Sequence, residues 1–469
     1  MNTAMRPLLM LPEMLTFGMG LLVLIGGSFL SRQRQWWARI VAAATLIGVV
    51  VVAAVGIAAP DQTAFDGAFA VDTTTAVARI TAAIGVLVVL ALAGDDIAAT
   101  TRESETYALL LFSTAGVMVL AGTDDLLVLA TGYLLASIPL YGLIGLSRSG
   151  PAAEAAVKTY LIGALFGITL LLGVTVLYGI SGASRYHELA AQLRGAPAAV
   201  VATGLVAVVA GLMFEAGGVP AHFWVPDAAQ GANGVAAVYL TTVPKIGALI
   251  ALYRVAGVVP HTVAWPLLIA IFAVASMTLG NLAAYGQQDP RRLLGWSTVS
   301  QVGYLLVPVT VAGRSELALP SLLFYLLAYT LTNSAAFAVS TALPDWRDLS
   351  AYRGLARARP WLAGALVVAL LGLVGTPPTS VFVAKLTTAI AVWDSGFPWL
   401  AVVVFVNSLL SLFYYLRWIA PVFQKPQMSD DFIPGGWSAR AAIVAAALSL
   451  GLGIAAGPLW EVLPTTPLR

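Results

Sequence analysis

The sequence predicts an all-α, polytopic membrane protein of about fourteen transmembrane helices, and its composition and apolar runs lead to this fold class. Of the 469 residues, 59% are hydrophobic and only 10% are charged, whereas soluble domains have about 25% charged residues. Apolar runs of about 18 residues or more, long enough to span a bilayer, recur from end to end. These runs lack period-two alternation and are too long for barrel strands, so we expect no strands.

The apolar runs place the helices along the chain. The connections between them are short, so we expect a single membrane domain over residues 1–469. The first run contains Glu13 and lacks a small-residue cleavage site, which indicates a retained helix and not a signal peptide. By the length criterion, the expected spans are residues 8–30, 38–60, 74–94, 106–122, 126–147, 154–180, 198–217, 232–256, 262–285, 290–312, 317–342, 359–390, 397–424 and 437–461.

Basic residues in the loops predict the orientation of these spans. The side richer in arginine and lysine is expected to be cytoplasmic, which places both termini outside, in agreement with an even number of spans. The residues of that side are Arg32, Arg34, Arg39, Arg102, Arg148, Arg291, Arg292, Arg347, Arg353, Arg357, Arg359, Lys425 and Arg440. The other side holds mainly Arg6, Arg185, Arg194, Arg254 and Arg314, with Asp61, Asp66, Asp72, Asp124 and Asp125.

The composition also excludes several functions. A net charge of only +2 gives no indication of a nucleic-acid partner. The absence of cysteine excludes thiolate-held iron–sulfur clusters, disulfides and cysteine nucleophiles in this chain. Three scattered histidines provide no metal-ligand spacing, so we expect no metal site and no cofactor here.

Ionisable residues inside the expected spans are the main candidates for function. A charge at mid-bilayer costs about 2.5–3.5 kcal/mol on insertion scales. A row of such groups bridged by water is what a proton relay needs, although residues near helix ends, as Glu13 and Glu154 are, can equally reach the interface. Lys245 and Lys385 lie mid-span, where that alternative is weaker. The full set is Glu13, Glu154, Lys158, Glu215, Lys245 and Lys385, with His222 close to a helix break.

Two predicted helix interruptions give a second signal. In GGVPAHFWVP, Pro220 and Pro226 remove backbone donors after a glycine pair, and in VGTPPTSVFVAKL the residues Pro377 and Pro378 do the same. Irregular backbone at membrane depth persists only where protein buries it or where it lines a water-filled cavity. One interruption in each half of a chain is typical of inverted-repeat transporters, whereas simple proline kinks are the alternative.

Three other features allow more than one interpretation. His222 is a proton carrier, a satisfied core residue or a loop-facing group, and a lone histidine is more often structural. The segment GLGIAA, residues 451–456, matches a dinucleotide fingerprint but lies inside an apolar span, so helix packing through small residues explains it better. The cluster FYYLRW, residues 413–418, is most simply an interfacial aromatic belt.

Several ordered motifs together resemble a known family over nearly the whole length. The chain resembles the antiporter-like membrane subunits of respiratory complex I, and among them subunit N of NADH–quinone oxidoreductase most of all. The motifs are LPEM at 11–14, EAAVKTYLIGA at 154–164, VPAHFWVPDAAQGA at 219–232, TTVPKIG at 241–247, GNLAAYGQQDPRRLLGWSTVSQVGYLL at 280–306, AYRGL at 351–355 and FYYLR at 413–417.

The resemblance implies a specific architecture. It implies fourteen helices, of which the seventh and the twelfth are broken, and two inverted five-helix repeats. The implied division is helices 1–3 in residues 1–105, helices 4–8 in residues 106–256, helices 9–13 in residues 262–424, and helix 14 in residues 437–461.

The resemblance also implies a place in a larger assembly. Family members belong to the membrane arm of a proton pump, in a bacterial-type inner membrane for a chain of this kind. NADH, FMN, iron–sulfur clusters and quinone are then expected in partner subunits, and the redox chemistry of the NADH:quinone oxidoreductase takes place there.

By position, the resemblance assigns roles to charged residues. Lys245 matches the family's central lysine, and Lys385 matches the lysine of the twelfth helix, on the route to one face. Glu154 and Lys158 match a charged pair at the start of the sixth helix, one turn apart. Together with Glu215, these residues form the predicted proton relay.

Three positions depart from the family pattern. Leu134 stands where the family has a glutamate, Glu215 where it has a lysine, and Gln301 where it has a histidine. Losing both members of a charged pair is less damaging than losing one. We therefore expect Glu215 to take over as the partner of Lys245, and the rival hypothesis is a divergent paralogue whose first half no longer conducts.

Other functional classes remain open at this point. They are a subunit of a multi-subunit cation/proton antiporter, a subunit of a membrane-bound hydrogenase, and a non-conducting scaffold. The LPEM start, the charged pair of the sixth helix and the AYRGL loop favour the N-type subunit. An unrelated solute carrier is least favoured, because no polar cluster indicates an organic substrate.

Overall fold

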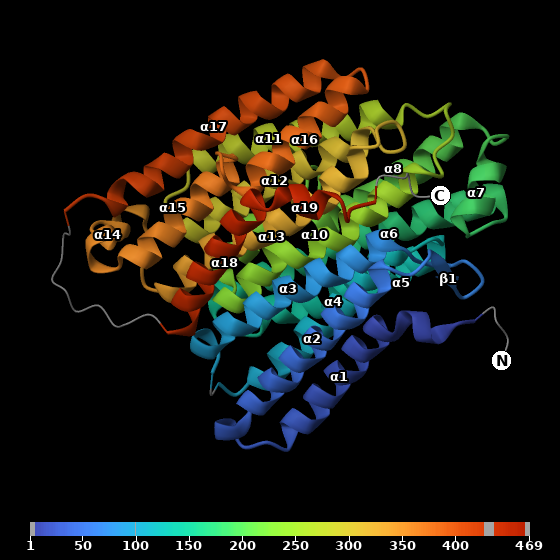
Figure 1. Cartoon of the computed structure of the whole chain (residues 1–469). Helices are drawn as coiled ribbons and strands as arrows, with labels where there is room; N and C mark the ends of the chain where they lie inside the picture. Colours follow the sequence, from blue (N-terminus) through green and yellow to red (C-terminus); the bar gives the residue numbers. More distant parts are fainter. Residues whose placement is uncertain (1–4, 99, 426–435, 465–469) are drawn as a thin grey trace.

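The computed structural model describes residues 5–98, 100–425 and 436–464, and in this part of the chain long helices lie side by side in one bundle (Figure 1). Among these residues, twelve helices are long and apolar enough to cross a membrane. The predicted all-α membrane fold is therefore confirmed. The two other expected spans correspond to α12, which is more polar, and to a pair of 15-residue helices, α15 and α16, so the count of fourteen stays a prediction.

The N-terminal part begins with a short 3-10 turn and then forms three long helices. Its elements are η1 (Pro7–Met10), α1 (Leu11–Ser28), η2 (Arg32–Arg34), α2 (Trp36–Ile57), β1 (Gln62–Ala64), β2 (Phe69–Val71) and α3 (Thr73–Asp96).

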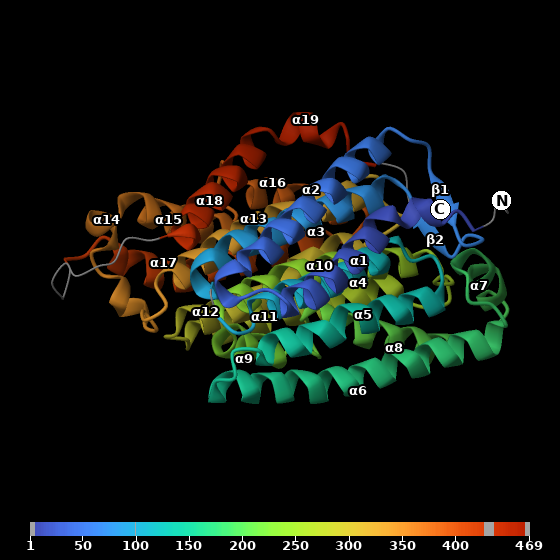
Figure 2. The same ribbon diagram turned by 90° about the horizontal axis from the view of Figure 1, so that it is seen from below.

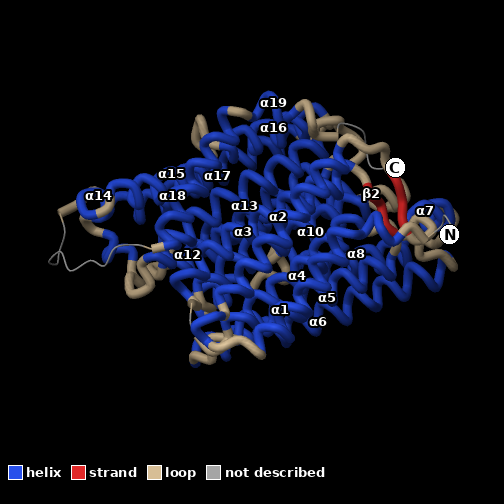
Figure 3. The backbone as a smooth tube through the Cα atoms, turned by 60° about the horizontal axis from the view of Figure 1, so that its bottom comes forward, coloured by secondary structure: helices blue, strands red, loops and turns tan. Residues whose placement is uncertain are grey.

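The strands β1 and β2 form a small antiparallel hairpin that the sequence reasoning missed (Figure 3, red). The turn between them contains Phe65, Asp66 and Gly67, all with positive φ. A three-residue strand has no apolar run, so the length criterion could not find it.

The middle of the chain contains the first predicted interruption. Its helices are α4 (Glu103–Gly122), α5 (Leu126–Gly145), α6 (Gly150–Ser181), α7 (Tyr186–Leu193), α8 (Ala198–Ala216), α9 (Trp224–Gly231) and α10 (Gly234–Ala256). Helix α7 was not predicted, because it is too short to span a bilayer and lies in a loop. The predicted seventh helix corresponds to α8 and α9.

The last part contains the second predicted interruption, between α15 and α16. Its elements are α11 (Trp265–Tyr285), α12 (Pro290–Thr310), α13 (Ala318–Ala342), η3 (Leu349–Tyr352), α14 (Leu355–Ala358), α15 (Pro360–Val374), α16 (Ser380–Asp394), α17 (Pro398–Val422), α18 (Trp437–Ile454) and α19 (Ala456–Trp460).

Burial divides the helices into a core and a periphery. The most apolar window of α10 is 100% buried and that of α13 is 94% buried, whereas α1 and α2 reach only 28% and α6 only 33%. Figure 2 shows α6 at one edge of the bundle and α10 inside it. The less buried helices expose apolar side chains on the outside of the bundle, as expected in lipid or against another chain.

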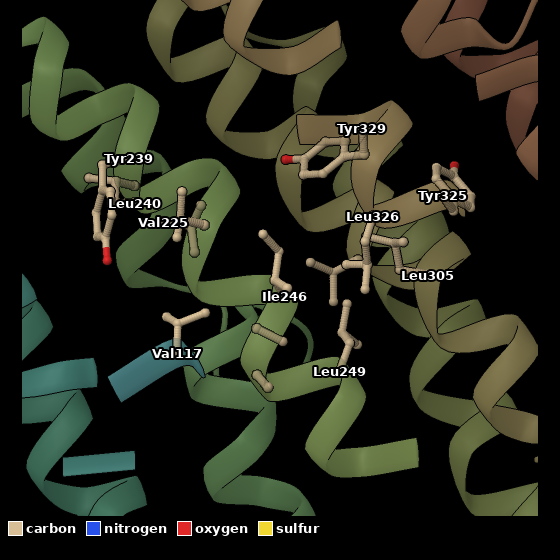
Figure 4. Packing of buried hydrophobic residues seen from close by; sticks show 14 of the residues in the cluster. Val117, Val225, Tyr239, Leu240, Ile246, Leu249, Leu305, Tyr325, Leu326 and Tyr329 are labelled. Carbon is tan, nitrogen blue, oxygen red and sulfur yellow. The ribbon is translucent and has the colours of Figure 1, made fainter. Parts of the chain in front are cut away.

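Apolar packing surrounds α10 on several sides (Figure 4). Ile246 and Leu249 of α10 lie in the same buried cluster as Val117 of α4 and Leu326 of α13. Gly247 brings the α4 and α10 backbones into close contact, because a Cβ there would lie 2.5 Å from the Val117 carbonyl oxygen. The segment of α10 beyond Lys245 is thus sealed by tightly packed side chains.

The aromatic cluster 413–418 does not form the expected interfacial belt. Tyr414, Tyr415 and Trp418 are fully buried inside the bundle, where Tyr415 pairs with Ser297. Phe413 is 53% exposed and lies on the outer face of α17. The helix turns three of the four aromatic side chains of the cluster inward, a direction that the sequence alone does not show.

The small-residue interpretation of residues 451–456 is supported. Gly453 of α18 has no room for a Cβ, because the backbone of Pro378 to Ser380 occupies that space. The glycine lets α18 lie directly against the second interruption, as small residues do at helix contacts in membranes.

Candidate functional site

The two helix interruptions have the same local geometry. Helix α8 ends at Gly217 (φ 78°) and α15 ends at Gly375 (φ 87°), both in the left-handed region that favours glycine. The N–H of Gly217 donates to the Met213 and Phe214 carbonyls, and that of Gly375 to Leu371 and Gly372. A cis Xaa-Pro bond follows two residues later in each case. Both predicted interruptions are present, at the predicted places.

Lys245 lies buried in α10, and Pro244, the residue before it, explains why its amine binds a main-chain carbonyl. Pro244 has no N–H, so the Leu240 carbonyl one turn earlier has no helical donor. The Lys245 amine donates to that oxygen at 2.5 Å. The amine also lies 5.4 Å from the centre of the Trp224 ring at the start of α9, and a Cβ on Gly217 would lie 3.5 Å from it. Lys245 therefore points into the first interruption.

Glu215 lies in the last turn of α8, two residues before that interruption, and is completely buried. The Ser137 hydroxyl of α5 donates to its Oε2 at 2.5 Å, while Oε1 has no hydrogen-bond partner among the described residues. No ion pair within 4.0 Å joins Glu215 to Lys245 in the described part of the chain. The expected partnership is therefore not a direct contact.

Lys385 of α16 occupies the second interruption and is held more fully. Its amine donates to the Leu373 and Val374 carbonyls, at 3.1 and 3.0 Å, and to the Ser408 hydroxyl of α17 at 3.1 Å. The two carbonyls are free because α15 ends there. The amine also lies 3.8 Å from the centre of the Tyr304 ring, within the range of a cation–π contact.

Gln301 connects the second site to the core of the bundle. Its Nε2 donates to the same Leu373 carbonyl at 2.9 Å, and the Tyr325 hydroxyl donates to its Oε1 at 2.8 Å. The sequence marked Gln301 as a departure from the family. The structure places it beside the carbonyl that Lys385 also uses.

A polar group of residues lies where α10, α12 and α13 meet. The Tyr329 hydroxyl of α13 donates to the Thr241 carbonyl at 2.7 Å and lies 3.2 Å from the Thr298 hydroxyl. Asn333 donates to the Thr241 hydroxyl at 3.2 Å, and its Oδ1 is buried without a partner in the described residues. Such buried, unpaired polar atoms are the usual binding places of internal water.

Glu154 and Lys158 lie in a different environment. Lys158 pairs with Glu154 at 2.7 Å and with Asp227 of α9 at 2.9 Å, and Arg292 of α12 pairs with the same Asp227 at 2.6 Å. The side chains of Lys158 and Glu154 are 46% and 67% exposed. They line a cavity of about 760 Å³, with Gln230 among its other lining residues.

Asp227 and Arg292 were missed as members of this group, although Asp227 lies within the quoted stretch 219–232. Burial would raise the pKa of Asp227, but the hydrogen bonds from Lys158 and Arg292 outweigh it and hold that pKa below its usual value. A carboxylate on α9 thus stays charged between cations from α6 and α12.

Glu13 is neither at the interface nor near the lysines. Arg79 of α3 holds it through two hydrogen bonds of 2.7 and 2.8 Å, and both side chains are only 4% exposed. The sequence reasoning did not include Arg79 among the charges inside the spans. It also placed Arg254 in a loop, whereas Arg254 is buried and binds Asp72 at 2.8 Å. Both are structural ion pairs, and a search for opposite charges in neighbouring spans could have indicated them.

His222 lies within the first interruption and is only 3% exposed. Its Nδ1 has no partner among the described residues, and neither has Nε1 of Trp296, whose ring centre lies 5.6 Å from that of His222. It is therefore a buried residue and does not face a loop. In the described residues, no group of three or more His, Asp or Glu side chains could hold a metal ion.

The fold and the site together define a class of protein. It is a multi-pass membrane protein of the antiporter-like type, in which two interrupted helices hold charged side chains inside the bundle.

Comparison with known proteins identifies the family. The transmembrane family of NADH:quinone oxidoreductase and Mrp antiporters matches residues 123–411, more than half of the chain. A protein of Mycobacterium sp. (strain JLS) named NADH-quinone oxidoreductase subunit N is 69% identical over 462 residues, 98% of each chain. The chain belongs to the family of NADH-quinone oxidoreductase subunit N.

Solved structures agree with this assignment. A chain of respiratory complex I from Thermus thermophilus with bound aureothin is 29% identical, with a TM-score of 0.84, and the match covers 97% of this chain and 99% of that one. A chain of the Mrp complex from Dietzia sp. DQ12-45-1b is 25% identical, with a TM-score of 0.80 and 96% of each chain covered. The fold is thus shared with antiporter subunits, while the sequence is much more similar to subunit N.

Proposed function

We propose that this chain is a proton-translocating subunit in the membrane arm of an NADH-quinone oxidoreductase, and that Lys245 and Lys385 carry the protons. The observation that supports this most directly is the shared design of the two sites. At each site a buried amine donates to a main-chain carbonyl that has lost its helical donor, because of Pro244 within α10 at the first site and because α15 ends at the second. Such a carbonyl stabilises the charged amine without neutralising it, so the amine can release its proton again.

The cavity at Glu154 and Lys158 is the proposed entrance. Its lining is charged, so we expect it to fill with water, and Asp227 extends it to α9, the second half of the interrupted helix. Glu154 and Lys158 then act at the mouth, where their exposure allows exchange with solvent, and not as buried carriers.

Glu215 is the proposed partner of Lys245 through an intervening water. The free oxygen Oε1 of Glu215 needs a hydrogen-bond donor. The Lys245 amine faces the interruption, which begins at Gly217, two residues after Glu215. A carboxylate and an amine that share one water can exchange a proton along it. This retains the partnership expected from the sequence, with one water in place of a direct bond.

From Lys245 the proposed path runs through the core to the second site. Tyr329 and Thr298 lead toward Tyr325 and Gln301, and Gln301 shares the Leu373 carbonyl with the Lys385 amine. Because neither the carboxamide nor the carbonyl can pass on a proton, water beside them has to carry it over this last step in the proposed path. This order matches two inverted repeats, residues 106–256 and 262–424, each with one lysine site.

The rest of the proposal concerns the assembly. Subunit N relatives indicate that NADH, FMN, iron–sulfur clusters and quinone are bound by partner subunits, whose redox reaction drives this chain. We place the chain in a bacterial inner membrane with its arginine-rich loops in the cytoplasm and both termini outside, as the loop charges favour.

Replacing each lysine tests the proposal. In membrane vesicles that contain the whole complex, Lys245→Ala and Lys385→Ala are expected to abolish most NADH-driven proton uptake. Lys425→Ala, a change at an exposed lysine after α17, is the matched control and is expected to pump normally. If both buried-lysine variants assemble and pump like the control, the proposal is wrong.

A second candidate is a subunit of a cation/proton antiporter, which the match to the Mrp complex favours. The same vesicles distinguish it. Proton movement driven by a sodium gradient, and independent of NADH, would support the antiporter.

A further inference from the structure

Helix α3 runs beside α10 and makes polar contacts with both of its ends. The two helices have nearly equal lengths, 24 and 23 residues. At one end, Asp96 accepts a hydrogen bond from the backbone N–H of Val235, in the first turn of α10, at 2.9 Å. At the other end, Asp72 binds Arg254, in the last turn of α10, at 2.8 Å through each carboxylate oxygen. The same guanidinium donates to the Thr75 hydroxyl at 3.0 Å and to the Ala121 carbonyl at 2.8 Å.

Between these contacts, α10 is weakened where it carries its lysine. Pro244 removes one helical hydrogen bond and prevents the Leu240 carbonyl from pairing within the helix. The direction of that carbonyl decides where the Lys245 amine lies, because it is the hydrogen-bond acceptor of the amine in this structure. A helix with such a weak point bends there unless its two halves are held.

The middle of α3 packs closely against α10 and α13 at this same level. Gly85 has no side chain, and a Cβ there would lie 3.1 Å from Val243, the neighbour of Pro244, and 2.9 Å from Thr330 of α13. The contacts at the two ends are therefore polar and directional, whereas the middle has only close packing.

We propose that Asp72 and Asp96 are positioning residues for Lys245: α3 holds both ends of the lysine-bearing helix and so fixes the direction of its two halves, on either side of Pro244, relative to the first interruption. This inference rests on the proposed function of Lys245. It assigns a role to the N-terminal helices, which lie outside the two predicted repeats.

The neighbouring aspartate provides a matched control. Asp95 accepts a hydrogen bond from the backbone N–H of Ser438, at the start of α18, at 2.7 Å. Asp95 and Asp96 are adjacent, on the same end of the same helix, but hold different partners. A change at Asp95 should loosen α18 and leave α10 in place.

The experiment compares Asp96→Ala, Asp96→Asn and Asp95→Ala in the purified whole complex. Asp96→Ala is expected to speed hydrogen exchange in α10 around residues 241–249, to lower proton pumping per electron several-fold and to shift the pH dependence of pumping, with electron transfer retained. Asp96→Asn keeps an oxygen acceptor for the Val235 N–H. In this variant we expect hydrogen exchange in α10, proton pumping per electron and the pH dependence of pumping to be as in the parent protein. Asp95→Ala is expected to affect exchange only in α18.

The other end is tested with a double replacement. Asp72→Asn alone leaves the Arg254 guanidinium buried without its counter-charge, which can prevent folding. Asp72→Asn combined with Arg254→Gln removes the contact without leaving a buried charge, and it should reproduce the Asp96→Ala effects.

Two results would overturn the inference, and Lys245→Ala separates them from failure of the proposed function. The first is normal pumping, with an unchanged pH dependence, in assembled Asp96→Ala and double variants while Lys245→Ala is inactive. The second is an Asp96→Asn variant as impaired as Asp96→Ala, since an intact acceptor would then not matter. Normal pumping by Lys245→Ala would instead refute the proposed function.

Discussion

The two interruptions share one backbone design but surround their lysines differently. Lys385 has three hydrogen-bond acceptors, two carbonyls and a hydroxyl, and the face of a tyrosine ring. Lys245 has one hydrogen-bond acceptor, the Leu240 carbonyl, and one aromatic neighbour, Trp224. The buried carboxylate of Glu215 lies in the last turn of α8, just before the interruption that Lys245 faces. The second site stabilises its amine with fixed dipoles, whereas the first adds a group that can itself gain or lose a proton. From this difference we expect the two lysines to respond differently when the groups around them are replaced.

The largest expected effect comes from removing either amine. Lys245→Met and Lys385→Met should each lower NADH-driven pumping by about tenfold or more, because a relay in series needs every titratable group. Proton uptake by vesicles, with quinone reduction measured in parallel, checks this. If only one of the two changes stops pumping, the sites are not in series and the comparison between them fails.

A smaller effect is expected at the carboxylate that only the first site has. Glu215→Gln keeps the size and the bond from Ser137 but cannot exchange a proton, so pumping should fall several-fold without stopping. Ser408→Ala is the corresponding change at the second site, where it removes one of three acceptors, and pumping should change less. Equal losses in the two variants would contradict the distinction drawn between fixed dipoles and a titratable partner.

Pro244→Ala should have a moderate effect with two opposite components. The new N–H would donate to the Leu240 carbonyl, so α10 gains up to about 3 kcal/mol of helix stability, while the Lys245 amine loses sole use of its acceptor. We expect a higher melting temperature for the complex together with slower pumping. A variant that pumps at the normal rate would show that the free carbonyl is not needed.

The smallest expected effect is a pH dependence of stability that arises in the loop between α4 and α5. Burial raises the pKa of Asp124, in the loop before α5, to about 6, with Asp72 and Asp125 adding to the rise and Arg254 and His187 opposing it. A carboxyl with a raised pKa binds its proton more tightly in the folded state. The contribution of Asp124 to the free energy of unfolding is therefore favourable at low pH and is lost as the pH rises from about 4 to about 6.

Asp124→Asn should remove that loss. The variant is expected to be more stable than the parent at pH 7, by on the order of 1 to 3 kcal/mol, and equally stable near pH 4. Thermal unfolding of the complex across this range measures the difference. A stability difference that is constant with pH would exclude titration of Asp124 as its cause.

The sequence predicted the features that depend on composition and on local chemistry. Long apolar runs gave the membrane helices, and the glycine–proline patterns after Phe214 and Val374 gave both interruptions. Lys245 and Lys385 were found because a lysine in the middle of an apolar run has no local explanation. The resemblance of ordered motifs then indicated subunit N, and the comparisons confirmed it.

The features that were missed depend on contacts between distant segments. Arg79 looks like a helix-end charge until α1 brings Glu13 to it, and Asp227 looks like a loop residue until α6 and α12 supply cations. The partnership of Glu215 and Lys245 stays a prediction: both residues lie beside the first interruption, and no ion pair within 4.0 Å joins them in the described residues. The roles of all these residues in transport stay predictions.

Gln301 would divide the proposed proton transfer between the two lysines into separate steps. A carboxamide neither picks up nor gives away a hydrogen ion near neutral pH, so it works as a fixed bracket that orients the Tyr325 hydroxyl. In the proposed relay, a proton would therefore have to pass Gln301 along hydroxyl groups and water, and each passage would leave those O–H bonds pointing the opposite way. The O–H bonds would have to reorient before the next proton passes, so reorientation would be a separate step of the proposed transport cycle.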